Sequence, residues 1–256
     1  MKIAMLTSNT ALSGKVILRR LVAGGLTPAA VIIERSIPDG INPLAGHYLL
    51  IKSKIKKWGW RYVAAKGARL LRGKIFPAGR IDHVTIHALA RGYGVPVRVV
   101  PDFNSSECRD FLNDLLPDIC TVSGTRILKP DIFRIPTRGC INFHTGLLPK
   151  YRGSDTIIWS LYHNDPVGVT IHKIAEKLDG GEIILEETIP VSPSDRYRDI
   201  YRKACERGAE MMARIVADPE HYLGNARNKY DPSFPVWKKA PRSIVAEVRK
   251  ARGGRL

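Results

Sequence analysis

Residues 2–34 contain two short apolar runs separated by a longer amphipathic one, and this pattern restricts the fold more than any other feature of the chain. The runs from Lys2 to Leu6 and from Ala29 to Glu34 predict buried strands, and the segment from Ser13 to Ala23 predicts a helix. A strand, a helix and a strand at this spacing form a right-handed parallel unit. We therefore expect an α/β protein with a mostly parallel sheet.

The same alternation continues to about residue 216. It predicts helices at about 82–91, from 104 or 105 onward, at 155–163 and at 195–216, and strands at 95–100, 119–123, 140–143, 168–173 and 182–189. The last two strands suggest a hairpin-like addition to the sheet. The turn after the first strand, residues 7–14, lacks the pattern G-x-G-x-x-G, and G-x-x-x-x-G-K-[ST] occurs nowhere. These absences argue against a dinucleotide cofactor and against an NTPase.

Two polar residues lie at the end of one predicted strand. Cys140, Ile141 and Phe143 form its apolar part, so Asn142 and His144, two positions apart, point to the same side. An amide such as Asn142 can stabilise negative charge that develops on an oxygen. An imidazole such as His144 can donate a hydrogen bond or exchange a proton near neutral pH. The alternative to a catalytic pair is that Asn142 caps the backbone and that His144 makes only structural hydrogen bonds.

A carboxylate is expected close to this pair. Asp179 follows the apolar stretch from Val169 to Ile174, at a place where a strand would end. From there it could orient His144 or accept a proton. His163 and His172, by contrast, are expected to be structural or solvated.

Three motifs around these residues occur in a fixed order. They are N-F-H at 142–144, L-L-P-K-Y-R-G at 147–153, and G-V-T-I at 168–171 followed by L-D-G-G-E-I-I at 178–184. Over roughly residues 82–190 the chain resembles the 10-formyltetrahydrofolate-dependent formyltransferases. The resemblance implies a Rossmann-like formyltransferase fold with helices on both faces of the sheet. It also implies 10-formyltetrahydrofolate as the formyl donor and no metal.

The resemblance assigns roles to particular residues. It implies that Asn142, His144 and Asp179 are catalytic. It implies folate binding by Gly124, Thr125, Arg126, Ile127, Leu128, Asp179 and Gly181, and substrate binding by Thr145, Gly146, Lys150, Arg152 and Gly153. Without it, residues 124–130 would be an ordinary strand-to-helix loop, and Lys150 and Arg152 would be surface charges. The family commonly has Pro-Ser at 145–146 and Thr-Gly at 180–181, and these loop differences concern the choice of substrate.

The charge of the chain favours an anionic partner. There are 41 Lys and Arg residues against 24 Asp and Glu, a net charge of +17. No acidic residue occurs between Asp39 and Asp82, and the basic residues there alternate with apolar ones, which predicts a basic helical insertion at about 40–80. Three roles remain open for this insertion: a solvated helix packed on the domain, docking on an anionic membrane surface, or a lid over the substrate.

The composition of the chain also indicates its domain boundaries, the state of its cysteines and its compartment. We expect a catalytic domain at 1–217 and a short carboxy-terminal extension at 218–256, whose prolines and aromatic residues predict an extended arm. Four scattered cysteines without a C-x-x-C pair argue against a zinc site and a disulfide framework. The opening segment turns polar at Thr7, too early for a signal peptide, so a cytoplasmic protein is expected.

The amine that receives the formyl group is the least constrained part of the prediction. About forty residues follow the last helix of the catalytic domain, which leaves no room for the barrel domain of methionyl-tRNA formyltransferases. The resemblance then favours a nucleotide-linked amino sugar, with no nucleic acid partner. Alternatives are methionyl-tRNA, glycinamide ribonucleotide or hydroxyornithine as acceptor, and a non-catalytic basic protein that binds nucleic acid or membranes. A homodimer also remains open.

Overall fold

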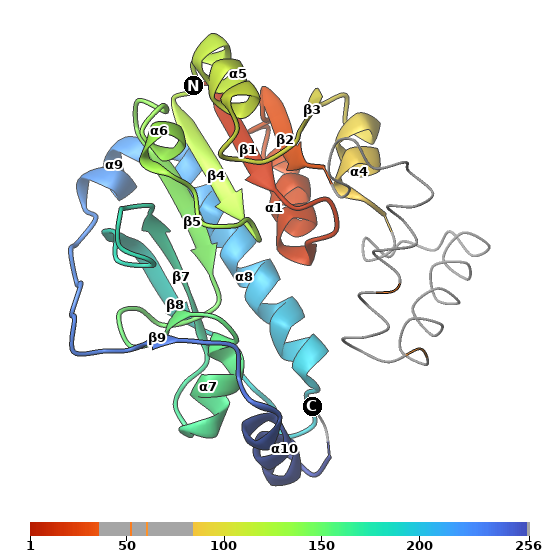
Figure 1. Ribbon diagram of the computed structural model, residues 1–256, viewed down its shortest axis with the longest axis vertical. Coiled ribbons are helices and arrows are strands. Elements are labelled where there is room, and N and C mark those ends of the chain that lie inside the picture. Colours follow the sequence, from red (N-terminus) through yellow and green to blue (C-terminus); the bar gives the residue numbers. More distant parts are fainter. Residues whose placement is uncertain (36–51, 53–59, 61–83, 255–256) are drawn as a thin grey trace.

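A computed structural model describes residues 1–35, 52, 60 and 84–254, and its central feature is a sheet of seven strands within those residues (Figure 1). The strand order is β3-β2-β1-β4-β5-β7-β8. Strands β1 to β5 run parallel to one another, β7 runs antiparallel to β5, and β8 runs antiparallel to β7. The strands are β1 (Ile3–Thr7), β2 (Ala30–Glu34), β3 (Val97–Val100), β4 (Ile119–Ser123), β5 (Cys140–His144), β7 (Gly168–Lys173) and β8 (Ile183–Thr188). The predicted mostly parallel sheet is confirmed.

Helices cover both faces of this sheet because most strands are apolar on both sides. On one face lie α1 (Leu12–Ala23), α4 (Ile86–Gly92) and α8 (Tyr197–Ala217), which pack on a core that includes Ile141 and Phe143. On the other face lie α5 (Ser106–Leu115) and α6 (Pro130–Phe133), which pack on a second core that includes Cys120 and Cys140. The alternation along β5 thus sends Cys140 to one core and Ile141 to the other.

Close packing fixes the position of β5. Gly208 of α8 lies directly against the ring of Phe143, where an added Cβ would come within 2.2 Å of a ring carbon. Only a residue without a side chain allows α8 to approach the strand this closely. The strand order also reverses between β1 and β4, a point at which open α/β sheets commonly bind ligands. The loop after β4, residues 124–128, lines a cavity together with the end of β5.

The segment after α8 corrects the prediction of a simple extended arm. It contains two helices, α9 (Pro219–Gly224) and α10 (Arg242–Ala251), and the chain between them is extended. Asp218 caps α9 by accepting a hydrogen bond from the His221 N–H, and Val248 of α10 is buried against α7 (Thr156–Tyr162). The prolines do not oppose these helices, because Pro219 begins α9 and Pro241 is the N-cap of α10, positions where no helical backbone N–H is required.

The extended part ends in a short strand, β9 (Val236–Trp237), which pairs in parallel with β6 (Arg152–Gly153). The predicted basic helix at about 40–80 lies outside the described residues, apart from Lys52 and Trp60. None of the helices in the described ranges combines the length and apolar character that crossing a bilayer requires.

Candidate active site

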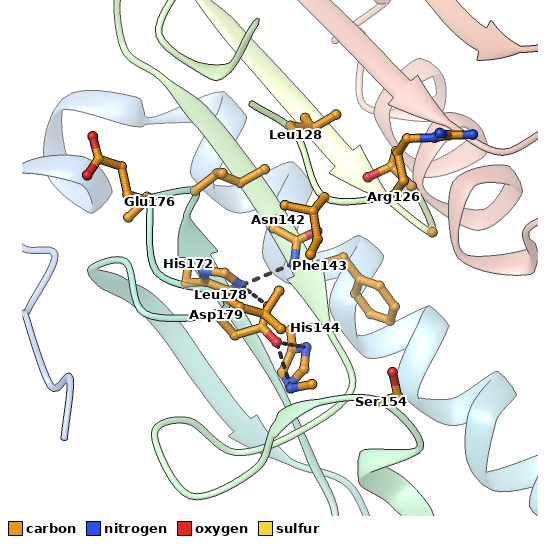
Figure 2. Close-up of a pocket in the computed structure, with 16 residues that line it drawn as sticks. Arg126, Leu128, Asn142, Phe143, His144, Ser154, His172, Glu176, Leu178 and Asp179 are labelled. Carbon is orange, nitrogen blue, oxygen red and sulfur yellow. Dashed lines mark hydrogen bonds and ion pairs between the residues drawn. The ribbon is translucent and has the colours of Figure 1, made fainter. Parts of the chain in front are cut away.

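A cavity of about 480 Å³ lies at the end of β5. Figure 2 shows Asn142 and His144 reaching it from β5, His172 from β7, and Asp179 from the turn that follows. Its walls also include residues 124–128, residues 174–176, Leu178 and residues 153–154. The predicted placement of Asn142 and His144 on one side of the strand is confirmed, and Asp179 joins them.

Asp179 is held in a fixed orientation. Its backbone is in the left-handed region, with φ of 48°, and its side chain is only 10% exposed. The backbone N–H of Gly153 donates to Oδ2 at 2.8 Å. The same oxygen lies 3.7 Å from Nδ1 of His144, and Oδ1 lies 3.6 Å from Nε2 of His172. Both carboxylate oxygens therefore face an imidazole ring.

His172 is a site residue that the sequence did not reveal. Its Nδ1 donates to the carbonyl oxygen of Lys173 at 2.9 Å, which leaves Nε2 of the neutral ring as an acceptor. The Asn142 amide Nδ2 donates to that Nε2 at 3.1 Å. The expectation that His172 has no part in the site is therefore wrong. The physical reason is strand register, since the antiparallel pairing of β5 and β7 sets Asn142 directly opposite His172.

His144 has a defined tautomer because one ring nitrogen is already committed. Its Nε2 donates to the carbonyl oxygen of Tyr151 at 2.6 Å, so in the neutral ring the lone pair is on Nδ1 and faces Asp179. Burial lowers the pKa of His144 below its usual value, and the Asp179 carboxylate opposes that shift only in part. At neutral pH the ring is therefore a neutral base with its free nitrogen beside a carboxylate.

Asp179 itself stays ionised. Burial would raise the pKa of this carboxyl group, but His144, His172 and the Gly153 N–H together lower it to about 2. A carboxylate with so low a pKa is a poor proton acceptor at neutral pH. Asp179 is better suited to stabilise charge on His144 than to accept a proton itself, because its fixed negative charge would stabilise a proton taken up at Nδ1 of His144.

The loop predicted to bind folate forms one wall of the cavity. All five of its named residues, Gly124, Thr125, Arg126, Ile127 and Leu128, line it. Gly124 has φ of +63°. The Asn104 side chain fixes the loop from behind, because it donates to the carbonyl of Ile127 at 3.0 Å and accepts from the N–H of Lys129 at 2.7 Å.

Arg126 has partners of its own in this wall. Its guanidinium group forms ion pairs with Glu34 at 2.7 Å and with Asp102 at 2.6 Å. It therefore ties the loop to the carboxyl ends of β2 and β3.

Of the residues predicted to bind the acceptor, some line the cavity and others do not. Gly153 lines the cavity, whereas Lys150 and Arg152 do not. The Lys150 ammonium group pairs with Asp165 at 2.6 Å. Arg152 is buried and its guanidinium donates to the carbonyl of Phe234, so the predicted grip on a phosphate does not fit its position. No local sequence pattern could predict this contact, because Phe234 lies 82 positions further along the chain.

Thr145, Gly146 and Gly181 also lie outside the cavity lining. Thr145 hydrogen-bonds Thr156, and the Gly146 carbonyl accepts from the Thr170 hydroxyl at 2.6 Å. An added Cβ on Gly181 would lie 1.9 Å from the Lys173 carbonyl oxygen, so this glycine serves close backbone packing.

The arrangement can support transfer of an acyl group to a nitrogen. It combines an oriented amide, a neutral imidazole and an ionised carboxylate on one cavity wall. The second N–H of the Asn142 amide has no partner within the described ranges of the chain, so it is available to an oxygen in the cavity. Over the described residues, no group of three or more His, Cys, Asp or Glu side chains is arranged to hold a metal ion.

Comparison with known sequences identifies the same region. The sequence model of the family described as "Formyl transferase" matches residues 100–216. A methionyl-tRNA formyltransferase from Kosmotoga olearia is 38% identical over 133 residues, which cover 51% of this chain and 43% of that protein. The chain spans about half the length of the curated relatives that it matches.

Comparison with solved structures confirms the predicted Rossmann-like formyltransferase fold. A phosphoribosylglycinamide formyltransferase from Bacillus halodurans has a TM-score of 0.57 at 16% identity, covering 87% of this chain and 99% of that one. An N-formyltransferase from Helicobacter canadensis, solved with folinic acid and dTDP-3-aminofucose, also has a TM-score of 0.57, at 17% identity. That match covers 93% of this chain and 71% of the other.

Proposed function

We propose that the chain is a member of the formyl transferase family, whose sequence model matches residues 100–216, and that it is an N-formyltransferase. In the proposed reaction it transfers a formyl group from 10-formyltetrahydrofolate to the amino group of a nucleotide-linked amino sugar. The observation that supports this most strongly is the convergence of Asn142, His144 and Asp179 on one cavity wall.

The cavity fits a folate of this kind. Its volume of about 480 Å³ falls within the ordinary range for small-molecule sites, roughly 300–1,000 Å³. Leu128, Ile174 and Leu178 offer apolar surface for a flat ring, and the backbone of residues 124–128 offers hydrogen-bonding groups beside it. We propose that these residues hold the folate. When bound, it supplies the formyl carbon, so the protein has only to orient the two reactants and to manage charge and protons.

The reaction requires a bond to form and another to break around one carbon. The amine nitrogen forms a bond to the formyl carbon, the bond from that carbon to folate N10 breaks, and one proton passes from the amine to N10. Negative charge develops meanwhile on the formyl oxygen. The available N–H of Asn142 is the group that would stabilise this charge, and His172 fixes its direction.

The proton released by the amine has a defined acceptor in the site, Nδ1 of His144. Nδ1 of His144 holds the free lone pair of the ring, and Asp179 lies 3.7 Å from it. A proton received there, directly or through a water, would be stabilised by the Asp179 carboxylate before it passes to N10. The Tyr151 carbonyl holds the opposite nitrogen throughout, so the ring need not rotate.

Two lines of support favour an amino-sugar nucleotide as the acceptor. The structural neighbour solved with dTDP-3-aminofucose covers 93% of this chain. A sugar 3N-formyltransferase solved with dTDP and a formyl folate covers the same share, at a TM-score of 0.55. The excess of basic residues also suits a pyrophosphate.

Methionyl-tRNA is the second candidate acceptor. The observation in its favour is sequence identity, since the curated relatives at 31–38% identity are methionyl-tRNA formyltransferases. A tRNA would also suit a net charge of +17.

The proposed activity is tested by incubating the protein with 10-formyltetrahydrofolate and a panel of UDP-, dTDP- and GDP-linked amino sugars. We expect tetrahydrofolate release that depends on one of these sugars and a product whose mass is increased by one formyl group in place of hydrogen. Folinic acid, which has its formyl group on N5, should compete for the same site. Folinic acid binding without release on any amine would contradict the proposed activity.

A further inference from the structure

The segment between α9 and α10, residues 225–240, contacts two loops beside the site, namely residues 150–154 and the turn that contains Asp179. We call this segment the arm. In Figure 1 it runs from α9 to β9 and then to α10. At its start, Arg227 exchanges backbone hydrogen bonds of 2.8 and 2.9 Å with Ile183. Further on, the ring of Tyr230 lies against Gly180, where an added Cβ would come within 2.9 Å of a ring atom. The arm thus borders the turn that contains Asp179.

The arm then pairs with the loop at 150–154. The Trp237 carbonyl accepts the Ser154 N–H at 2.8 Å, and the Trp237 indole N–H donates to the Lys150 carbonyl at 3.0 Å. Gly153 lies between these bonds with φ of +99°, and an added Cβ would come within 2.2 Å of the Trp237 carbonyl oxygen. Trp237 therefore contacts the loop on both sides of Gly153.

Buried and stacked groups hold this pairing in place. The Arg152 guanidinium lies 4.9 Å from the centre of the Tyr230 ring and donates to the Phe234 carbonyl. The Trp237 ring lies 4.5 Å from Trp159 and 4.9 Å from His163, centre to centre. A desolvated guanidinium on an aromatic ring is a strong contact that water replaces poorly. The arm is accordingly an integral part of this side of the protein.

The same loop supplies the two backbone groups that orient the site. The Tyr151 carbonyl accepts from His144, and the Gly153 N–H donates to Asp179. We propose that the arm is a positioning element of the active site and that Trp237 is a positioning residue, which acts on His144 and Asp179 through this loop. The effect on rate rests on the proposed function, whereas the effect on the geometry of His144 does not. A displacement of about 1 Å in such a site can cost about 10²-fold in rate.

Rate measurements on three variants provide the first test. Trp237→Ala removes the stacking and the indole N–H, and Trp237→Phe removes only the N–H. Val236→Ala is the matched control, because its side chain on the same strand is 44% exposed. We expect kcat to fall at least about tenfold in Trp237→Ala, by a smaller factor in Trp237→Phe, and less than twofold in the control. The KM for the formyl donor should change less than threefold.

An NMR titration of the His144 ring gives a second readout that needs no activity. Asp179 and His172 are the titratable groups that face this ring, and all three side chains are unchanged in the Trp237 variants. Burial lowers the pKa of His144, and the Asp179 carboxylate and the Tyr151 carbonyl raise it. Because the loop positions both of these groups, loosening of the loop in Trp237→Ala should shift that pKa. The control should titrate as the wild type does.

The outcomes separate the two proposals. An unchanged His144 titration in folded Trp237→Ala overturns the positioning role, even if the rate falls, because the arm would then only stabilise the fold. A shifted titration with a wild-type kcat overturns it as well. If the wild type forms no product with any amine, the proposed function fails, while the His144 titration still decides whether the arm orients the site.

Discussion

The free ring nitrogen of His144 lies 3.7 Å from a carboxylate oxygen of Asp179, while the opposite ring nitrogen donates to a backbone carbonyl. These two contacts define one tautomer and one orientation of the imidazole. They support the proposed roles of Nδ1 of His144 in proton uptake and of Asp179 in charge stabilisation. The predictions for Asp179, His144 and the pH dependence rest on these proposed roles, and those for Asn142 and His172 rest on the orientation of the Asn142 amide.

Asp179→Asn should abolish most activity without unfolding the protein. The change keeps the shape of the side chain and removes the charge that would stabilise a proton on His144, so we expect kcat to fall by about 10²-fold or more. Steady-state kinetics beside far-UV circular dichroism checks this. Asp114→Asn on the exposed face of α5 is the matched control. A loss of activity accompanied by lost helical signal at the assay temperature would favour a structural role instead.

Asn142→Ala should reduce turnover far more than folate binding. Loss of a single hydrogen bond to a developing oxyanion typically costs ~10²–10³ in rate, and we expect this loss in kcat with less than a threefold change in the Kd of folinic acid. His144→Asn should show the same separation. Asn113→Ala, an equivalent change on an exposed part of α5, should be silent. Near-normal turnover in either site variant would refute the assignment.

His172 should act through Asn142. His172→Leu removes the acceptor of the Asn142 amide, so the amide can rotate, and we expect about a tenfold loss in kcat, a fraction of the cost of losing the donor itself. His172→Gln keeps an acceptor and should restore part of the rate. The measurement is kcat and KM for both variants. Equal activity of the Leu and Gln variants would show that orientation of the amide is not limiting.

The pH dependence of turnover follows from His144. The ring must be neutral to receive a proton, and its pKa is lowered, so kcat should rise with pH through a midpoint below the ordinary value of about 6.5. Asp179 raises the pKa of His144, so in Asp179→Asn the midpoint of the residual activity should move to lower pH. A pH–rate profile of both proteins tests this. A midpoint that moves upward would contradict the proposed pairing.

Local patterns in the sequence predicted most of the fold and the positions of the three candidate catalytic residues. The apolar runs at 119–123 and 140–143 predicted strands β4 and β5. The period of two along a strand predicted that Asn142 and His144 lie on the same side of β5, and both line the cavity. Asp179 was found because it follows the apolar stretch that forms β7. The motif resemblance added the loop at 124–128, all of whose residues line the cavity.

The features that the sequence did not predict depend on contacts between segments that lie far apart along the chain. The role of His172 depends on the register of β5 against β7, which no local pattern encodes. Arg152 was expected to grip phosphate, but Tyr230 and Phe234, far along the chain, bury it. The helix α10 was missed because its apolar stripe has meaning only against α7.

The acceptor is the central claim, and salt dependence distinguishes the two candidates most directly. A tRNA that contacts six or more phosphates should lose ~10³ or more in affinity between low and moderate salt, whereas a sugar nucleotide with two phosphates should lose far less. The measurement is a formylation assay on an amino-sugar nucleotide and on charged initiator tRNA, each with a salt titration of affinity. We predict efficient formylation of the sugar nucleotide with a shallow salt dependence. Efficient formylation of the tRNA with a steep salt dependence would contradict the account.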